Sequence, residues 1–176
     1  VLKVLQSEGK IRHFGISIHD PQEGFAAIEQ GPVATIQAVY NLLDRRVEAN
    51  LLEACREREI GLIAREPMAN GLLTEKFNAE QLPQFEPGDI RSHWPKPYLA
   101  QRIRAGAQFN RLRPTHYPSL TALALKFTLS HPAVSVVIPG CKTVAQTQQN
   151  MRISDLPDLT NEELKMLQPA SASSNR

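Results

Sequence analysis

The segment SVVIPGCKTVAQTQQN, residues 135–150, contains residue types suited to binding a phosphate group. Gly140 frees the backbone directly after an apolar run, and Thr143 can cap a helix whose first N–H groups lack intrahelical partners. Such a helix start attracts anions, and Lys142 adds a full positive charge beside it. Three amide side chains that can hydrogen-bond a sugar or a base follow on the helix: Gln146, Gln149 and Asn150. The alternative interpretation is a plain connection with an exposed lysine and surface amides.

Polar side chains also occur in two apolar runs nearer the N-terminus. Ser17 lies at the end of the run 11–18, and Gln37 lies inside the run 35–42. A buried amide needs hydrogen-bond partners for two donors and one acceptor. The partners of Gln37 are either neighbouring polar side chains or a ligand that carries its own amide group.

Arg65 is the third candidate, because it directly follows the apolar run 61–64 and precedes Glu66. Its guanidinium can pair with Glu66 or Glu48 as part of the structure, or it can lie on a planar ring or bind an anion. The small residues Ala69, Asn70 and Gly71 in the following segment, 67–76, permit a close approach of the backbone to a pyrophosphate. This segment is not a Walker loop and has no G-x-G-x-x-G pattern.

Four short apolar runs are predicted to be strands buried on both faces: residues 11–18, 35–42, 61–64 or 65, and 135–138. Each is followed by turn residues and then by helical periodicity, which indicates βα units and a parallel sheet. Such units form an open sheet or part of a closed barrel, and in both architectures ligands bind at the carboxyl ends of the strands. We therefore expect the candidate residues to lie at one end of the sheet.

Capping signals predict where the helices begin. DPQE at 20–23 and TNEE at 160–163 are capping boxes, and Pro21 suits a first helical position. Further helices are predicted over about 47–55, 98–112 and 120–127 and after Thr143. The stretch from about 70 to 118 is long for a connection, so we predict a lid or binding loop there, the alternative being a surface insertion.

Composition indicates a globular domain of ordinary type. The chain has 176 residues, 41% hydrophobic and 22% charged, and its net charge of +2 gives no indication of binding to nucleic acid or a membrane. The two cysteines, Cys55 and Cys141, have no metal-ligand spacing and fit a reducing cytoplasm. Residues 1–168 are predicted to be one unit and 169–176 a disordered tail. Residues 1–8 resemble the end of an amphipathic helix, so we expect the segment to come from a longer protein.

These segments, in this order, resemble the second half of an aldo-keto reductase. GKIRHFGISIHD resembles the family's GKIRxxGVSN, TIQAVYNL contains the Q-x-x-Y-N run, and REPMANGLLTEK resembles the P-L-A-x-G-L-L-T-G-K loop. SHPAVSVVIPGCKTVAQTQQN resembles SHPAVSSVIPGxRTPEQxxEN. The resemblance implies about the last four βα units of a (β/α)8 TIM barrel plus a C-terminal helix. It also implies NADPH-dependent reduction of a small aldehyde or ketone.

The resemblance assigns cofactor-binding positions as well. Ser17 and Gln37 match residues that hold the nicotinamide carboxamide, and Arg65 matches the residue that stacks on the nicotinamide ring. The positions that match the pyrophosphate loop are Pro67, Met68, Ala69, Gly71 and Leu72. The positions that match the adenosine end are Ile138, Gly140, Lys142, Gln146, Gln149 and Asn150. Among these, Lys142 is suited to the 2′-phosphate of NADPH.

Three departures from the family pattern affect these expectations. Ile18 replaces the Asn of the family's Ser-Asn pair, and Gln149 replaces a Glu. The family's catalytic Asp, Tyr, Lys and His belong to the first four strand units, so no residue here is assigned a catalytic role and none a metal. We therefore expect this segment to supply most of the cofactor site and little or no turnover.

Two other functions remain open from the sequence. One is a non-catalytic nucleotide-sensing or channel-associated barrel subunit, and the other is a different phosphate-binding βα barrel, such as a lyase or an isomerase. A half-barrel also leaves two apolar edges, at 11–18 and 135–138, with unpaired backbone groups. These edges predict self-association or pairing with the missing N-terminal half of the barrel.

Overall fold

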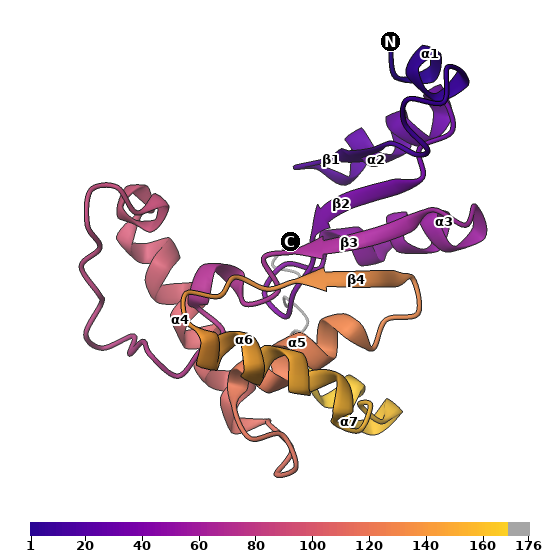
Figure 1. Cartoon of the computed structure of the whole chain (residues 1–176). Helices are drawn as coiled ribbons and strands as arrows, with labels where there is room; N and C mark the ends of the chain where they lie inside the picture. Colours follow the sequence, from indigo (N-terminus) through magenta and orange to yellow (C-terminus); the bar gives the residue numbers. More distant parts are fainter. Residues whose placement is uncertain (169–176) are drawn as a thin grey trace, which may run out of the picture.

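The computed structural model of the chain describes residues 1–168 and contains one parallel β-sheet with helices around it (Figure 1). The strands are β1 Gly15–Ser17, β2 Thr35–Val39, β3 Gly61–Arg65 and β4 Val134–Ile138. Their order in the sheet follows their order in the chain, and every neighbouring pair is parallel. The predicted α/β class and parallel sheet are confirmed.

The register of the strands separates two faces of the sheet. On one face the side chains of Ile36, Ala38, Leu62 and Ala64 are at most 1% exposed, because helices cover them. The other face, called the open face below, is formed by Gly15, Ser17, Thr35, Gln37, Val39, Gly61, Ile63, Arg65, Val136 and Ile138. Since no helix in residues 1–168 covers this face, its side chains are half-buried or exposed.

The prediction of strands buried on both faces is therefore wrong for this chain. All three residues of β1 are exposed, and in β4 Val136 and Ile138 are 43% and 44% exposed. The cause is the position of β1 and β4 at the two edges of a sheet that is covered on one face only. The predicted strand at 11–18 also shortens to Gly15–Ser17, because only these residues pair with β2.

The helices are α1 Leu2–Ser7, α2 Pro21–Gln30, α3 Leu51–Glu57, α4 Lys96–Arg111, α5 Leu120–Leu129, α6 Val144–Met151 and α7 Asn161–Met166. Both predicted capping boxes are present, with Asp20 and Glu23 at α2 and with Thr160 and Glu163 at α7. The predicted helix at 47–55 is divided into the 3-10 helix η1 Arg46–Ala49 and α3. The remaining 3-10 helices are η2 Ala69–Gly71, η3 Ile90–His93 and η4 Arg152–Asp155. The predicted tail at 169–176 lies outside the described residues.

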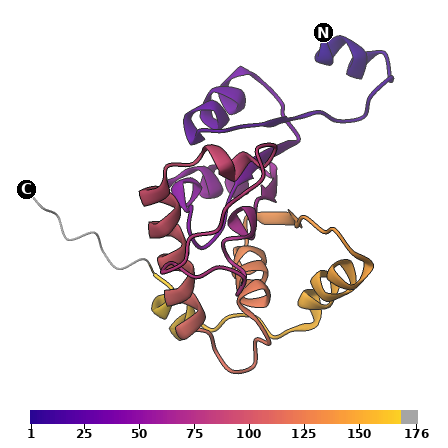
Figure 2. The same ribbon diagram turned by 90° about the vertical axis from the view of Figure 1, so that its left-hand side faces the viewer.

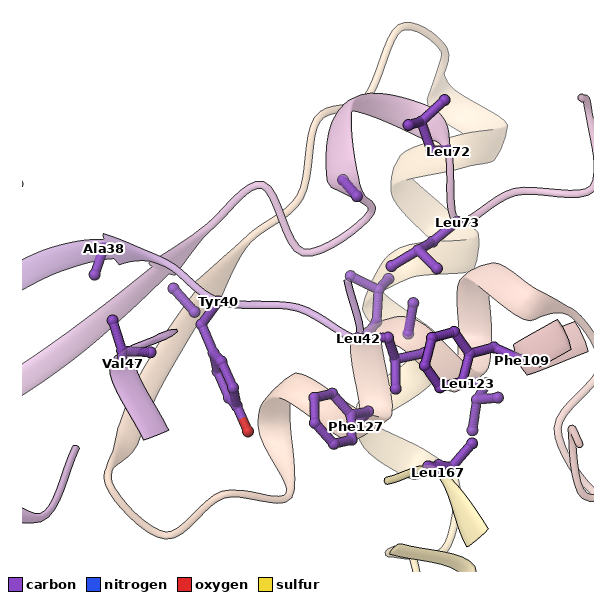
Figure 3. Packing of buried hydrophobic residues seen from close by; sticks show 14 of the residues in the cluster. Ala38, Tyr40, Leu42, Val47, Leu72, Leu73, Phe109, Leu123, Phe127 and Leu167 are labelled. Atoms are coloured by element: carbon purple, nitrogen blue, oxygen red, sulfur yellow. The ribbon is translucent and has the colours of Figure 1, made fainter. Parts of the chain in front are cut away.

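The hydrophobic core joins the covered face of the sheet to the helices (Figure 3). Tyr40, just after β2, packs against Phe127 of α5 with ring centroids 5.5 Å apart. Leu72, in the loop after β3, is 2% exposed. A Cβ atom at Gly106 of α4 would lie 2.8 Å from the carbonyl oxygen of Leu72, so a glycine is needed for this approach. The core therefore holds the loop after β3 firmly against α4.

Two helices contribute nothing to this core. α1 lies at the N-terminus beyond the end of α2, and α6 lies beyond β4 at the margin of the molecule (Figures 1 and 2). Neither of them contains a buried residue. Among residues 1–168, no helix has both the length and the apolar character required to cross a membrane.

Candidate functional site

Three of the predicted residues meet at the carboxyl ends of β1, β2 and β3. Ser17 and Gln37 are paired in register, and the Ser17 hydroxyl donates to Oε1 of Gln37 at 3.4 Å. Arg65, which ends β3, reaches across the end of β2 and donates from Nη2 to the carbonyl oxygen of Ile18 at 3.1 Å. The same nitrogen lies 3.2 Å from Nδ1 of His19. The prediction that these strand-end residues lie together is confirmed.

Of the two acidic partners predicted for Arg65, the structure selects Glu66, whose carboxylate forms an ion pair with Nη1. Glu48 instead accepts a hydrogen bond from the hydroxyl of Tyr40 at 2.7 Å. Burial, and then this bond, raise the pKa of Tyr40 above its usual range. Nε of Arg65 is buried and has no hydrogen-bond partner among residues 1–168. The guanidinium is thus fixed in place but still has an unused donor.

The loop after β3 has an unusual backbone. Glu66, Ala69 and Asn70 have φ angles of 55°, 48° and 54°, in the left-handed region that side chains other than glycine seldom adopt. Asn70 Nδ2 donates to Glu66 Oε2 at 2.7 Å, and the Ala69 N–H donates to the Glu66 carbonyl at 2.8 Å. Arg91 Nη1 donates to the Asn70 carbonyl at 2.9 Å. These bonds hold the loop in its strained conformation.

Asn41, the last residue of the Q-x-x-Y-N run, is a positioning residue to which the sequence assigned no role. It is 1% exposed, and its Oδ1 accepts from the N–H groups of Leu43 and Asp44 at 2.8 and 2.9 Å. Its Nδ2 donates to the carbonyl oxygen of Glu66 at 2.9 Å. Asn41 therefore ties the loop after β2 to the loop after β3. Its place directly after a strand was the available signal, although the sequence does not indicate the partner.

The residues assigned to the pyrophosphate loop differ in accessibility. Pro67, Ala69 and Leu72 are buried, on the side of the loop that faces the hydrophobic core. Met68 and Gly71 are half-buried. Side-chain contacts from the first three to a ligand are therefore excluded in this conformation. A phosphate at this loop would meet backbone groups and the edge of Met68.

The second cluster is the turn from Pro139 to Thr143 and the start of α6. The Thr143 hydroxyl accepts from the N–H of Gln146 at 3.2 Å, which confirms the predicted cap. The side chain of Gln146 bonds back to the turn: its Oε1 accepts from the N–H of Lys142 at 2.7 Å. Asn150 Nδ2 donates to Sγ of Cys141 at 3.1 Å. Gln146 and Asn150 therefore stabilise the turn itself.

The outer surface of this turn is accessible. Gly140 is exposed, and no atom lies within 4 Å of the position that a Cβ atom would take there. Lys142, Gln149 and Ile138 are exposed as well. Because Ile138 pairs in register with Arg65, the turn begins beside the Arg65 cluster. The two clusters therefore lie at the same end of the sheet, on the neighbouring strands β3 and β4.

The long segment between β3 and α4 is held together by the contacts of Arg91. Arg91 donates from Nε to Asp89 Oδ1 at 2.9 Å, and its guanidinium lies 4.1 Å from the ring centroid of Phe85. Arg91 is the main reason why the pKa of Asp89 is well below its usual range, and Lys142 lowers that pKa further. The segment predicted to be a lid or binding loop is thus anchored at the loop after β3 through Arg91.

Comparison with known proteins links this geometry to one family. The family model described as "Aldo/keto reductase family" matches residues 1–172. The chain is 31% identical to the uncharacterized oxidoreductase YqkF of Bacillus subtilis, over 93% of this chain and 51% of that protein. It is 28% identical to the NADH-specific methylglyoxal reductase of Escherichia coli K12, over 86% of this chain and 46% of that protein.

Solved structures give the same result for the fold. The glycerol dehydrogenase AKR11B4 from Gluconobacter oxydans matches with a TM-score of 0.78 and 29% identity, over 94% of this chain and 50% of that structure. The chain therefore spans about half the length of the relatives that it matches. Its four βα units are those of part of a (β/α)8 barrel, as the sequence predicts.

We predict that Asn41→Ala loosens the loop after β3. The change removes three hydrogen bonds in a buried position and lowers the free energy of unfolding by about 1–3 kcal/mol. Chemical denaturation measures this loss, and hydrogen exchange of the amides in residues 66–73 should become faster. The matched control is Asn78→Ala, because exposed Asn78 accepts only the N–H of Glu80. Equal effects of the two substitutions would contradict the role of Asn41.

Proposed function

Because the chain belongs to the aldo/keto reductase family, we propose that it holds the cofactor for NADPH-dependent reduction of aldehydes or ketones. The observation that carries the proposal is the position of two complementary clusters at the carboxyl end of one parallel sheet. One cluster contains Ser17, Gln37 and Arg65, and the other contains Lys142 at the start of α6. Ligands of α/β barrels bind at this end of the strands.

The first cluster suits the nicotinamide ring. The Ser17 hydroxyl occupies Oε1 of Gln37, which leaves the amide nitrogen of Gln37 to donate to the carbonyl oxygen of a carboxamide. The planar guanidinium of Arg65, fixed by Glu66 and the Ile18 carbonyl, offers a face for ring stacking. Ile18 is 2% exposed and makes no polar side-chain contact, so the carboxamide depends on Ser17 and Gln37 alone.

The second cluster suits the adenosine end of the cofactor. The free N–H groups at the start of α6 and the charge of Lys142 attract a phosphate, and the open surface at Gly140 admits it. One relative is described as NADH-specific, so membership of the family does not decide between the two cofactors. The preference for NADPH rests on Lys142, whose ammonium group can neutralise the additional 2′-phosphate.

We place the catalytic acid outside these residues. Reduction of a carbonyl by hydride requires a proton donor for the developing alkoxide. Tyr40 is buried against Glu48, and the hydroxyl of Tyr117 donates to the Pro157 carbonyl at 2.8 Å. Burial is the main cause that raises the pKa of Tyr117 to about 12. The ring of Tyr98, at the start of α4, packs edge to face with Trp94 at 5.6 Å between ring centroids. A second part of the barrel would therefore supply the acid.

We also place the activity in the cytoplasm. Neither cysteine forms a disulfide: Cys55 is buried and Cys141 is exposed. An exposed free thiol is typical of a reducing compartment. Burial raises the pKa of the Cys55 thiol to about 11, so this group is neutral at physiological pH and takes no part in the chemistry.

We predict that Lys142→Ala weakens NADPH binding about tenfold and leaves NADH binding nearly unchanged. Loss of one charge-assisted contact to a phosphate accounts for an effect of this size. Calorimetric titration with each cofactor measures both affinities. Lys165→Ala, at an exposed site on α7, is the matched control. Equal losses for the two cofactors, or no loss for either, would refute the assignment of Lys142.

We predict further that the 176-residue chain binds NADPH without oxidising it when aldehydes or ketones are added. The physical reason is that the two clusters proposed to bind the cofactor belong to this chain, whereas its three tyrosines make their contacts elsewhere, with Glu48, Pro157 and Trp94. Absorbance of the reduced nicotinamide, followed with a panel of carbonyl compounds, measures turnover. Sustained oxidation that depends on the carbonyl compound would show that the acid is in this chain.

A further inference from the structure

One side chain beside the first cluster, that of His19, has no part in the proposed function. It follows Ile18 directly, lies just beyond the end of β1 and is exposed. Its ring nitrogen Nδ1 lies 3.2 Å from Nη2 of Arg65, although 46 positions of the chain separate the two residues. Among residues 1–168, His, Cys, Asp and Glu side chains form no group that suits a metal ion. The contact with Arg65 is therefore the feature of His19 that requires an explanation.

This contact determines where the proton of the His19 ring lies. An arginine side chain has N–H donors and no acceptor, so Nδ1 of His19 must accept from Arg65. The ring is then neutral and carries its proton on Nε2. The other tautomer and the cation both have a proton on Nδ1 that would meet the N–H groups of Arg65, and the cation adds repulsion between like charges. Only one of the three forms of the ring fits the contact.

The backbone of His19 is held separately from its ring. Its N–H donates to Oε2 of Glu23 at 2.7 Å, and the N–H of Asp20 donates to the same oxygen at 3.2 Å. These bonds, the one from His19 first, lower the pKa of Glu23 below its usual range, so the carboxylate stays charged at neutral pH. Glu23 belongs to the capping box of α2. The ring therefore extends from a fixed place, and a change of the side chain at position 19 leaves the cap of α2 intact.

Three acceptors surround the guanidinium of Arg65. Glu66 accepts from Nη1, while the Ile18 carbonyl at 3.1 Å and Nδ1 of His19 both accept from Nη2. The N–H groups of a guanidinium lie in its plane, so each acceptor restrains that plane at one point. Two such points define an axis about which the group can still turn, and a third point fixes the plane. His19 supplies the third point without adding a second negative charge beside Arg65.

We propose that His19 is a positioning residue for the nicotinamide site, because it holds the plane of the Arg65 guanidinium on whose face the nicotinamide ring stacks. The proposal rests on the proposed function, since it takes Arg65 as the stacking residue. His19 acts through Arg65 and does not touch the ring, whose carboxamide is held by Ser17 and Gln37. Loss of the His19 ring therefore weakens binding at the nicotinamide end of the cofactor. It has no effect at the Lys142 turn, which lies between β4 and α6.

Two ligands separate the two ends of the site in a calorimetric titration of the 176-residue chain. NADPH has both ends, and 2′-phospho-ADP-ribose has the same phosphates and adenosine without the nicotinamide ring. His19→Ala should weaken NADPH binding by about threefold to tenfold, the effect of one lost hydrogen bond, and change 2′-phospho-ADP-ribose binding by less than about twofold. His19→Asn should recover most of the loss, because Oδ1 of asparagine supplies an acceptor near the place of Nδ1. His13→Ala is the matched control, because exposed His13 precedes β1, at the end of the strand away from Arg65.

The outcomes separate this inference from the function on which it rests. If the unaltered chain binds neither ligand, the proposed function is refuted and the inference fails with it. If the unaltered chain binds both, the inference alone is refuted when His19→Ala weakens both ligands equally or neither, or when His19→Asn binds NADPH no better than His19→Ala. NMR of the histidine ring nitrogens in the unaltered chain tests the same contact without any variant. It should find Nδ1 of His19 unprotonated and Nε2 protonated at neutral pH, and a proton on Nδ1 would overturn the proposal.

Discussion

Parallel pairing in register is the constraint on which the rest of this structure depends. Parallel strands have all their carboxyl ends at one end of the sheet, so the residues that follow them meet in space although they are far apart in the chain. Ser17 lies beside Gln37 for this reason, and Arg65 lies beside Ile138. A shift of one residue in any pair would turn Gln37 or Arg65 toward the covered face, where Ala38 and Ala64 are packed against helices.

Glu66 fixes the relative positions of the residues that follow β2 and β3. Its carboxylate pairs with Arg65 and accepts from Asn70, and its carbonyl oxygen accepts from Asn41. These contacts join the ends of β2 and β3, and they hold a backbone conformation that would be unfavourable alone. The Gly106 contact to Leu72 adds support from α4. The conformation of the loop that resembles the family's pyrophosphate loop therefore depends on residues with no predicted ligand contact.

Much of the local structure was predictable because short-range signals determine it. The capping boxes at Asp20 and Thr160, the Thr143 cap and the strand-end position of Arg65 follow from residue types and spacing. The burial of the strands was not predictable, because it depends on whether another element covers the open face. The partner of Arg65 was open between Glu48 and Glu66 for a similar reason, since only the packing of Tyr40 assigns Glu48 elsewhere.

The predictions for the candidate cofactor site were likewise of two kinds. Some features are determined by adjacent residues, and others depend on contacts between distant parts of the chain. The capped turn at Thr143 follows from adjacent residues, whereas the structural roles of Asn41 and Arg91 arise from contacts across 25 and 21 positions of the chain. A single sequence does not indicate these contacts. Arg91 belongs to no recognised motif, and the Q-x-x-Y-N run that contains Asn41 does not identify Glu66 as its partner. Assignment of each side chain to a part of the cofactor stays a prediction.

The central claim is that one dinucleotide spans the two clusters. The most direct measurement is amide NMR of the isotope-labelled chain, titrated first with 2′-phosphorylated adenosine and then with NADPH. The account predicts that the adenosine compound shifts only the amides around Gly140, Lys142 and Thr143. NADPH should shift these and, in addition, the amides around Ser17 and Arg65. Shifts from NADPH that leave either cluster unchanged would contradict the account.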